Sequence, residues 1–134
     1  MIKLIIGNRG SGKTKILIDM MKEALKTSKG TVVCVDKSKK LMYDVNSAIR
    51  LVDVEQYGIT GHKSFAGFIL GILANNYDIT DIFIDSLFKI VGRDYDKLEE
   101  FFNSINDYAK DINIVFTVST DVSELSENVQ KLAL

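Results

Sequence analysis

The sequence predicts an α/β fold: a three-layer sandwich in which helices cover both faces of a mostly parallel sheet of about five strands. Apolar runs of strand length alternate along the 134 residues with longer segments in which apolar residues recur at helical spacing. These runs are apolar without alternation, which is typical of strands that are buried on both faces. The chain has no proline and no low-complexity linker, so we expect one domain over residues 1–134.

The first half of the chain predicts three strands and two helices. The strands are expected at Ile2–Ile6, Thr31–Val35 and, more briefly, Arg50–Val54. The helices are expected at Lys13–Lys26, which Lys29-Gly30 would close, and at Lys63–Asn75. We expect the second helix to be mostly buried, with Gly67 and Gly71 permitting close backbone packing.

The second half predicts two strands, each followed or preceded by a helix. The strands are expected at Ile82–Ile84 and Ile112–Val118, and the helices at Asp96–Lys110 and Glu124–Leu132. The Asp96–Lys110 segment is amphipathic, and its apolar stripe consists of Leu98, Phe101, Phe102, Ile105 and Tyr108.

A glycine-rich segment between the first strand and the first helix carries the chemistry. Residues 7–14 match the pattern G-x-x-x-x-G-K-[ST] in full. Glycines let backbone N–H groups approach phosphate oxygens, and the helix that follows directs its free N–H groups at the same oxygens. The predicted nucleotide-binding residues are Gly7, Asn8, Arg9, Gly10, Ser11, Gly12, Lys13, Thr14 and Lys15.

Within this segment, Lys13 would place its charge on the β- and γ-phosphates and act in catalysis. We expect its side chain to face solvent before a nucleotide binds. The Thr14 hydroxyl can ligate Mg²⁺, and ATP with Mg²⁺ is the predicted ligand. A GTPase of the Ras type is disfavoured because no N-K-x-D base-reading motif occurs, so ATP is preferred over GTP.

Two further strand ends supply polar groups. Asp85 follows the apolar run Ile82–Ile84 and is the predicted second Mg²⁺ ligand, whereas Asp81 should lie at the opposite end of that strand. Ser119 and Thr120 end the last strand, at the edge where open α/β sheets bind ligands. A γ-phosphate-sensing role for these two hydroxyls and ordinary turn chemistry are equally compatible with the sequence.

Together these segments resemble the P-loop NTPase superfamily, and their order looks most like a minimal RecA-like core. The resemblance implies that the polar-ended strand lies between the phosphate-loop strand and the acidic strand. The chain is also distantly similar to the core of thymidine kinases. Those enzymes carry a cysteine-rich zinc lasso, which the single Cys34 cannot supply.

The chain departs from this resemblance at the acid that orients the attacking water. Related ATPases often hold a glutamate directly after the acidic strand, where this chain has Ser86. The remaining candidates are Asp36, which is the better placed, and Glu55, although a solvated carboxylate at a strand end is the favoured interpretation for each. We expect the second strand at or near the sheet edge, which would leave Asp36 rather far from the phosphates.

For two arginines and the single histidine, a structural role is the favoured interpretation. Arg9 and Arg93 could reach a nucleotide in a neighbouring subunit, but surface ion pairs are the favoured interpretation for both. His62 is the only histidine and is expected at a helix entry or in a loop.

The composition restricts the classes of partner that the chain is expected to bind. The formal net charge of −1 does not indicate nucleic acid, and the longest apolar stretch, Phe65–Ala74, is about half of a membrane span. A single cysteine and an opening too short for a signal peptide predict a cytoplasmic location. A protein partner or a second copy of the chain could dock on the Phe65–Leu73 segment or on the outer face of the domain, although a helix buried wholly within one chain is the favoured interpretation.

Three functions fit these residues. The first is a small ATPase whose slow hydrolysis is coupled to a partner. The second is a nucleotide-dependent switch or scaffold without significant intrinsic hydrolysis. The third, a small-substrate kinase, is disfavoured because the chain has no arginine-rich lid segment.

Overall fold

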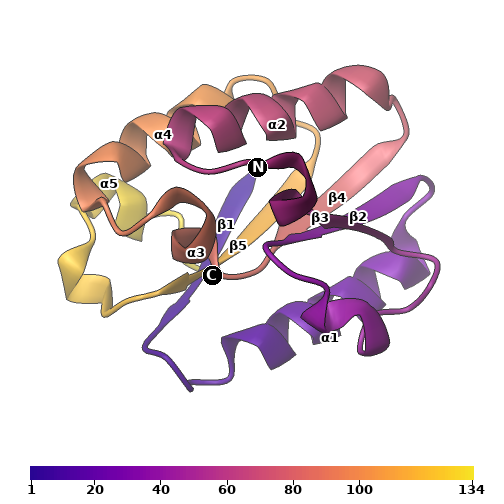
Figure 1. The fold of residues 1–134 in the computed structure, drawn as a ribbon, viewed down its shortest axis with the longest axis horizontal. Coiled ribbons are helices and arrows are strands. Elements are labelled where there is room, and N and C mark those ends of the chain that lie inside the picture. The colour runs from indigo at the N-terminus through magenta and orange to yellow at the C-terminus, as the bar shows by residue number, and fades with distance from the viewer.

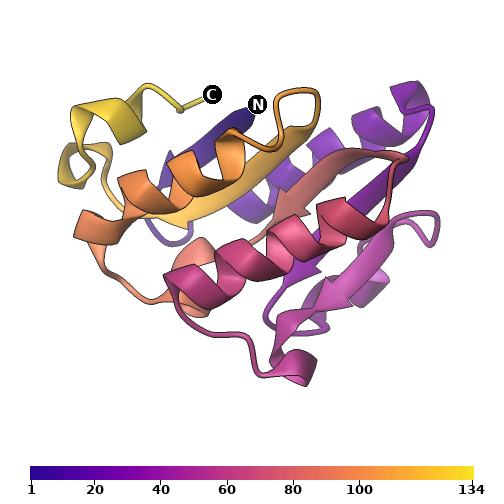
Figure 2. The ribbon, with the colours of Figure 1, turned by 90° about the horizontal axis from the view of Figure 1, so that it is seen from above.

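The computed structural model describes all of residues 1–134 and contains a five-stranded, all-parallel sheet with helices on both faces (Figures 1 and 2). The strands are β1 (Ile2–Gly7), β2 (Thr31–Asp36), β3 (Arg50–Asp53), β4 (Ile79–Ile84) and β5 (Asn113–Ser119). Their spatial order is β1-β5-β4-β2-β3, and every neighbouring pair is parallel. The predicted α/β class is confirmed, and β5 lies between β1 and β4 as the RecA-like resemblance implies.

Helices of unequal length form the outer layers. Helix α1 (Lys13–Thr27) covers one face of the sheet, while α2 (His62–Asn75) and α4 (Leu98–Asn106) run side by side over the other (Figure 2). Two short helices, α3 (Leu87–Val91) and α5 (Glu127–Gln130), add apolar residues to the α2 and α4 side. No helix has the length and hydropathy that crossing a lipid bilayer requires.

The two-residue period of the strands divides the core between the two faces. In β2, Val33 and Val35 join the core under α2 and α4, whereas Val32 and Cys34 pack on the α1 side. The larger core contains a group of aromatic rings from α2, α4 and β5, in which Phe102 and Phe116 meet with centroids 5.3 Å apart. This packing fixes the sheet whose carboxyl edge carries the polar strand ends.

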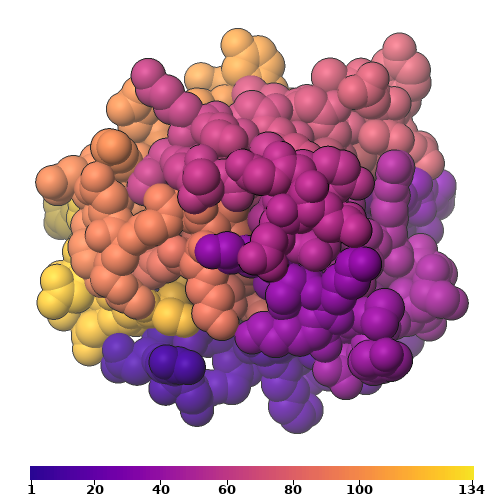
Figure 3. Space-filling model, in the orientation of Figure 1, coloured from indigo at the N-terminus to yellow at the C-terminus, as the bar shows by residue number.

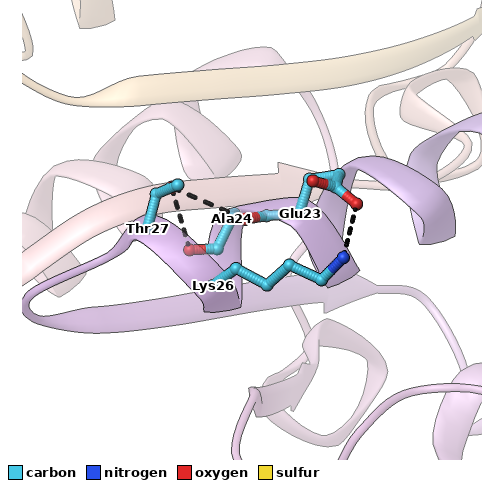
Figure 4. Close-up of polar contacts among 4 residues, drawn as sticks. All are labelled: Glu23, Ala24, Lys26 and Thr27. Atoms are coloured by element: carbon cyan, nitrogen blue, oxygen red, sulfur yellow. Dashed lines mark hydrogen bonds and ion pairs between the residues drawn. The ribbon is translucent and has the colours of Figure 1, made fainter.

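Side chains in the last turn of α1 form contacts within the helix itself (Figure 4). Thr27 Oγ1 donates to the carbonyl oxygen of Ala24 at 3.4 Å, and Lys26 forms an ion pair with Glu23 at 3.0 Å. A hydroxyl and a cation in the last turn satisfy carbonyl groups and complement the helix dipole. Three residues, Ser28 to Gly30, then connect α1 to β2.

Three helix predictions need correction. Helix α2 is buried only along Phe65, Ala66 and Ile69, and Gly67 and Gly71 face open space instead of a packed backbone. The apolar residues of α2 surround the helix, so most of them lie half-buried on its flanks.

The Asp96–Lys110 helix is shorter than predicted, because a 3₁₀ turn (η3, Tyr95–Lys97) precedes α4 and tight turns follow Asn106. Those turns direct Tyr108 outward, where 74% of it is exposed. The predicted last helix, Glu124–Leu132, reduces to α5, whose four residues follow another 3₁₀ turn (η4, Val122–Glu124).

Candidate functional site

The glycine-rich segment forms the connection between the end of β1 and the start of α1. Gly12 stands at the N-cap of α1 with a φ of 87°, a left-handed conformation that a side chain would strain. No side chain caps this helix end. The first N–H groups of a 15-residue helix therefore remain available to an anion beside the loop.

Lys13 folds back onto this loop. Its Nζ donates to the carbonyl oxygen of Asn8 at 2.9 Å and to Ser11 Oγ at 3.4 Å, and the residue is 8% exposed. The expectation that Lys13 faces solvent is wrong. A partly buried ammonium group needs hydrogen-bond acceptors, and the loop provides them. Burial lowers the pKa of Lys13, and the nearby carboxylate of Asp85 opposes that shift.

Thr14 and Asp85 meet although 71 residues separate them in the chain. Thr14 Oγ1 lies 3.2 Å from each carboxylate oxygen of Asp85, which is 3% exposed at the end of β4. A second hydroxyl, Thr117 Oγ1 of β5, donates to Asp85 Oδ1 at 2.7 Å. The parallel order β5-β4 delivers these groups to one edge of the sheet.

This donor set fits Mg²⁺. A hydroxyl and a carboxylate are hard oxygen donors, and Mg²⁺ bound with a nucleotide usually takes one or two protein ligands together with phosphate oxygens and water. No group of three or more acidic, histidine or cysteine side chains is gathered anywhere in the chain. Metal binding at Thr14 and Asp85 would therefore depend on the phosphates of a bound nucleotide.

The loop opens into a cleft of about 1140 Å³ at the carboxyl edge of the sheet. Of the predicted nucleotide-binding residues, all except Gly7 and Ser11 line it. Ser119 and Thr120 line it as well, and Thr120 binds the loop directly through its N–H, which donates to the carbonyl oxygen of Gly7 at 3.1 Å. The cleft thus combines the glycine-rich loop, the Thr14–Asp85 pair and the polar end of β5.

Asp36 lies close to this cleft but does not line it. Strand β2 is one strand in from the sheet edge, as expected, and its direct pairing with β4 places Asp36 beside the acidic strand. The Asp36 carboxylate accepts from the N–H of Lys37 at 2.7 Å. Burial raises the pKa of Asp36, and repulsion from Asp85 adds to the shift.

The structure does not bring Glu55 to the cleft. It is exposed in a 3₁₀ turn (η2, Val54–Tyr57) after β3, and β2 lies between that edge strand and β4. Asp81 lies inside β4, toward the end opposite Asp85, where it accepts from Asn113 Nδ2 at 3.2 Å.

Arg9 and Arg93 both line the cleft, and neither forms an ion pair. The favoured interpretation of surface ion pairs is therefore wrong. Arg93 lies over the ring of Phe88, with 4.7 Å to its centroid, and its Nη1 donates to Tyr95 Oη at 2.9 Å. Tyr95 Oη is in turn 2.8 Å from Thr120 Oγ1, which connects the segment after β4 to the end of β5.

Sequence reasoning missed several residues that contribute to the site. Thr117 carries the one hydroxyl group inside the apolar run of β5. A polar residue within an apolar strand could have indicated that Thr117 belongs to the site. Ser86 is the only non-glycine residue with a positive φ, 57°, and its N–H donates to Thr117 Oγ1 at 2.6 Å. The cleft residues of α3, including Lys89, were missed because a five-residue helix shows no periodicity.

His62 is the first residue of α2, as predicted, and lies outside the cleft. Its ring meets Phe101 edge-on at 5.9 Å, and its Nε2 is buried without a hydrogen-bond partner. Burial lowers the pKa of His62.

Comparisons with known proteins add little to this geometry. No family model matches the chain, and no curated protein matches it. Among solved structures, it is similar to domain III of the Thermotoga maritima replication initiation protein DnaA, with a TM-score of 0.49 and 18% identity. That match covers 97% of this chain and 50% of the other, so the chain spans about half of that structure's length. A likeness this distant carries no weight for the function, which must be inferred from the chain's own residues.

Proposed function

We propose that this chain is a Mg²⁺-dependent, ATP-binding P-loop protein of the cytoplasm that hydrolyses ATP slowly and acts through a protein partner. The observation that carries the proposal is the contact of Thr14 with Asp85 at 3.2 Å, beside the uncapped N-terminus of α1 and the Lys13 ammonium. These groups together can hold a phosphate chain and its metal ion.

Each residue has a defined task in this proposal. The N–H groups of the loop and of α1 bind phosphate oxygens, and Lys13 exchanges its contacts with Asn8 and Ser11 for the β- and γ-phosphates. Thr14 and Asp85 would hold Mg²⁺, which would supply positive charge to the phosphates. Ser119 and Thr120, which line the same cleft, would sense the γ-phosphate.

Slow hydrolysis follows from the position of the acids. The residue after Asp85 is Ser86, which cannot serve as a base of carboxylate strength. Asp36 is the nearer candidate to orient a water, but its carboxylate is buried and engaged by the N–H of Lys37. Glu55 would have to move from the far side of β2 to take part.

The same observations favour a second candidate, a nucleotide-dependent switch or scaffold without significant intrinsic hydrolysis. Phosphate release, measured with and without candidate partners, distinguishes the two: turnover that reaches about 1 s⁻¹ or faster indicates an ATPase. Rates on the order of 10⁻⁴ to 10⁻² s⁻¹, like those of unassisted GTPases, indicate a switch. A small-substrate kinase remains the third candidate, and a phosphorylated product rather than free phosphate would identify it.

The Asp85→Asn variant tests the metal site of the proposal. ATP affinity should fall more in Mg²⁺ than in EDTA, because the amide keeps the shape of the side chain and loses its charge. Calorimetric titrations in the two buffers measure the difference. Asp81→Asn, on the same strand but outside the cleft, is the matched control. An equal loss of affinity in both buffers would contradict the role of Asp85 in metal binding.

A further inference from the structure

The cleft holds more positive charge than a phosphate loop alone requires. Besides Lys13, four cationic side chains line it without a carboxylate partner: Arg9, Lys40, Lys89 and Arg93. The three ion pairs of the chain involve Lys15, Lys26 and Lys97 instead. Of the three acids in the cleft, Asp85 is already bonded to Thr14 and Thr117 and Asp121 to Ser123, while Glu124 forms no ion pair.

Two of these cations, Lys40 and Lys89, lie together. Lys40 begins a 3₁₀ turn (η1, Lys40–Tyr43) after β2, and Lys89 belongs to α3 after β4. Because β2 and β4 are neighbours in the sheet, the segments after them meet at its carboxyl edge. Figure 3 shows the purple and orange parts of the chain in contact on this face, above the indigo N-terminal part.

Their proximity is unfavourable without a counterion. The pKa of Lys89 is lowered first by Lys40, which contacts it, then by burial and by the charge of Arg9. The carboxylate of Asp36 offsets this repulsion in part, and it does not line the cleft. An anion bound between the two ammonium groups would remove the repulsion and gain a charge-assisted hydrogen bond from each.

We propose that Lys40 and Lys89 form a second phosphate-binding site at the β2 side of the cleft, separate from the phosphate loop. Two ammonium groups, with Arg9 nearby, match the double negative charge of a terminal phosphate better than the single charge of a carboxylate. The phosphate would be either the γ-phosphate of the bound nucleotide or a phosphate group of a second ligand. The inference builds on the proposed function because both sites share one cleft.

The test uses Lys40→Ala, Lys89→Ala and, as matched control, Lys39→Ala, an exposed lysine next to Lys40 that does not line the cleft. ATP and ADP affinities are measured by calorimetry, and inorganic phosphate is titrated into ADP-loaded and ATP-analogue-loaded protein. If the site takes the γ-phosphate, both cleft variants should weaken ATP binding roughly tenfold and spare ADP binding. If it takes a second ligand, they should spare both nucleotides and weaken phosphate binding to the analogue-loaded protein. Lys39→Ala should change neither quantity.

The proposal is overturned if Lys40→Ala and Lys89→Ala leave the ratio of ATP to ADP affinity and the binding of phosphate unchanged in both nucleotide states. Failure of the proposed function is distinguishable from this result. If the wild-type chain binds no nucleotide, inorganic phosphate is titrated into the nucleotide-free Lys13→Ala protein. Binding that depends on Lys40 and Lys89 would then support the second site alone, and its absence would overturn that site too.

Discussion

Asp36 combines a buried carboxylate with a position next to the acidic strand, so its substitution tests both the stability of the fold and the proposed hydrolysis. Its pKa is raised in the folded chain, so the folded state disfavours the ionised form, and stability falls as the pH rises through that pKa. We expect Asp36→Asn to leave the unfolding free energy at pH 7 unchanged or higher, while single-turnover phosphate release slows.

Urea unfolding and rapid-quench phosphate release measure the two quantities for Asp36→Asn. A variant that is both less stable and slower would show that Asp36 is structural. Glu55→Gln is the matched control, because its exposed side chain lies outside the cleft. If neither substitution alters phosphate release, neither Asp36 nor Glu55 orients the water, and the switch function is favoured.

His62 gives a second test at the scale of one residue. Its lowered pKa means that the unfolded chain takes up the proton first as the pH falls below about 6.5. The contribution of His62 to stability is therefore present above that pH and lost as the pH falls through the folded-state pKa. Asp94 opposes the shift and Lys97 reinforces it, both more weakly than burial.

The expected outcome is that His62→Phe loses less stability between pH 7 and pH 5 than the wild-type chain. The phenyl ring keeps the edge-on contact with Phe101 and removes the buried nitrogen that has no partner. Urea midpoints at the two pH values provide the measurement. Identical pH dependence of the two proteins would mean that His62 titrates normally in the fold.

At the scale of elements, the aromatic residues of α4 pack this helix against the sheet. Phe102 is 2% exposed and packs edge-to-face on Phe116 of β5. We expect Phe102→Ala to lower the unfolding free energy by about 3–5 kcal/mol, because it removes buried area and leaves a cavity. Tyr108→Ala, on the exposed side of the following turn, should change it by less than about 0.5 kcal/mol. Chemical denaturation of both variants measures the contrast, and similar losses would contradict the register of α4.

The sequence predicts an element well where neighbouring residues form a clear pattern. The glycine-rich loop, α1 and the buried strands follow from glycine positions and apolar runs, and the position of Asp85 at a strand end follows from its place after such a run. The burial predicted for Tyr108 is wrong because periodicity does not reveal where a helix ends. Helix α3 is too short to show a period, so the cleft residues that it carries could not be anticipated.

At the scale of the whole molecule, the strand order creates the site. The carboxyl ends of β1, β5, β4 and β2 meet at one edge and bring together groups that are remote in the chain, such as Thr14 with Asp85 and Lys40 with Lys89. The order β1-β5-β4 is implied by the resemblance to RecA-like cores, whereas the direct pairing of β2 with β4 is not. That pairing is set by tertiary packing, and no local sequence pattern predicts it.

Calorimetric titration of Mg²⁺-ATP into the wild-type chain and into Lys13→Ala tests the central claim most directly. Thermal melting of both proteins checks the fold, since Lys13 also donates to Asn8 and Ser11. Lys39→Ala controls for the loss of one positive charge. We predict that the wild-type and control proteins bind one ATP per chain and that Lys13→Ala, although folded, shows no measurable binding. Equal ATP affinity of wild type and folded Lys13→Ala, or no binding by the wild-type chain, would contradict the account.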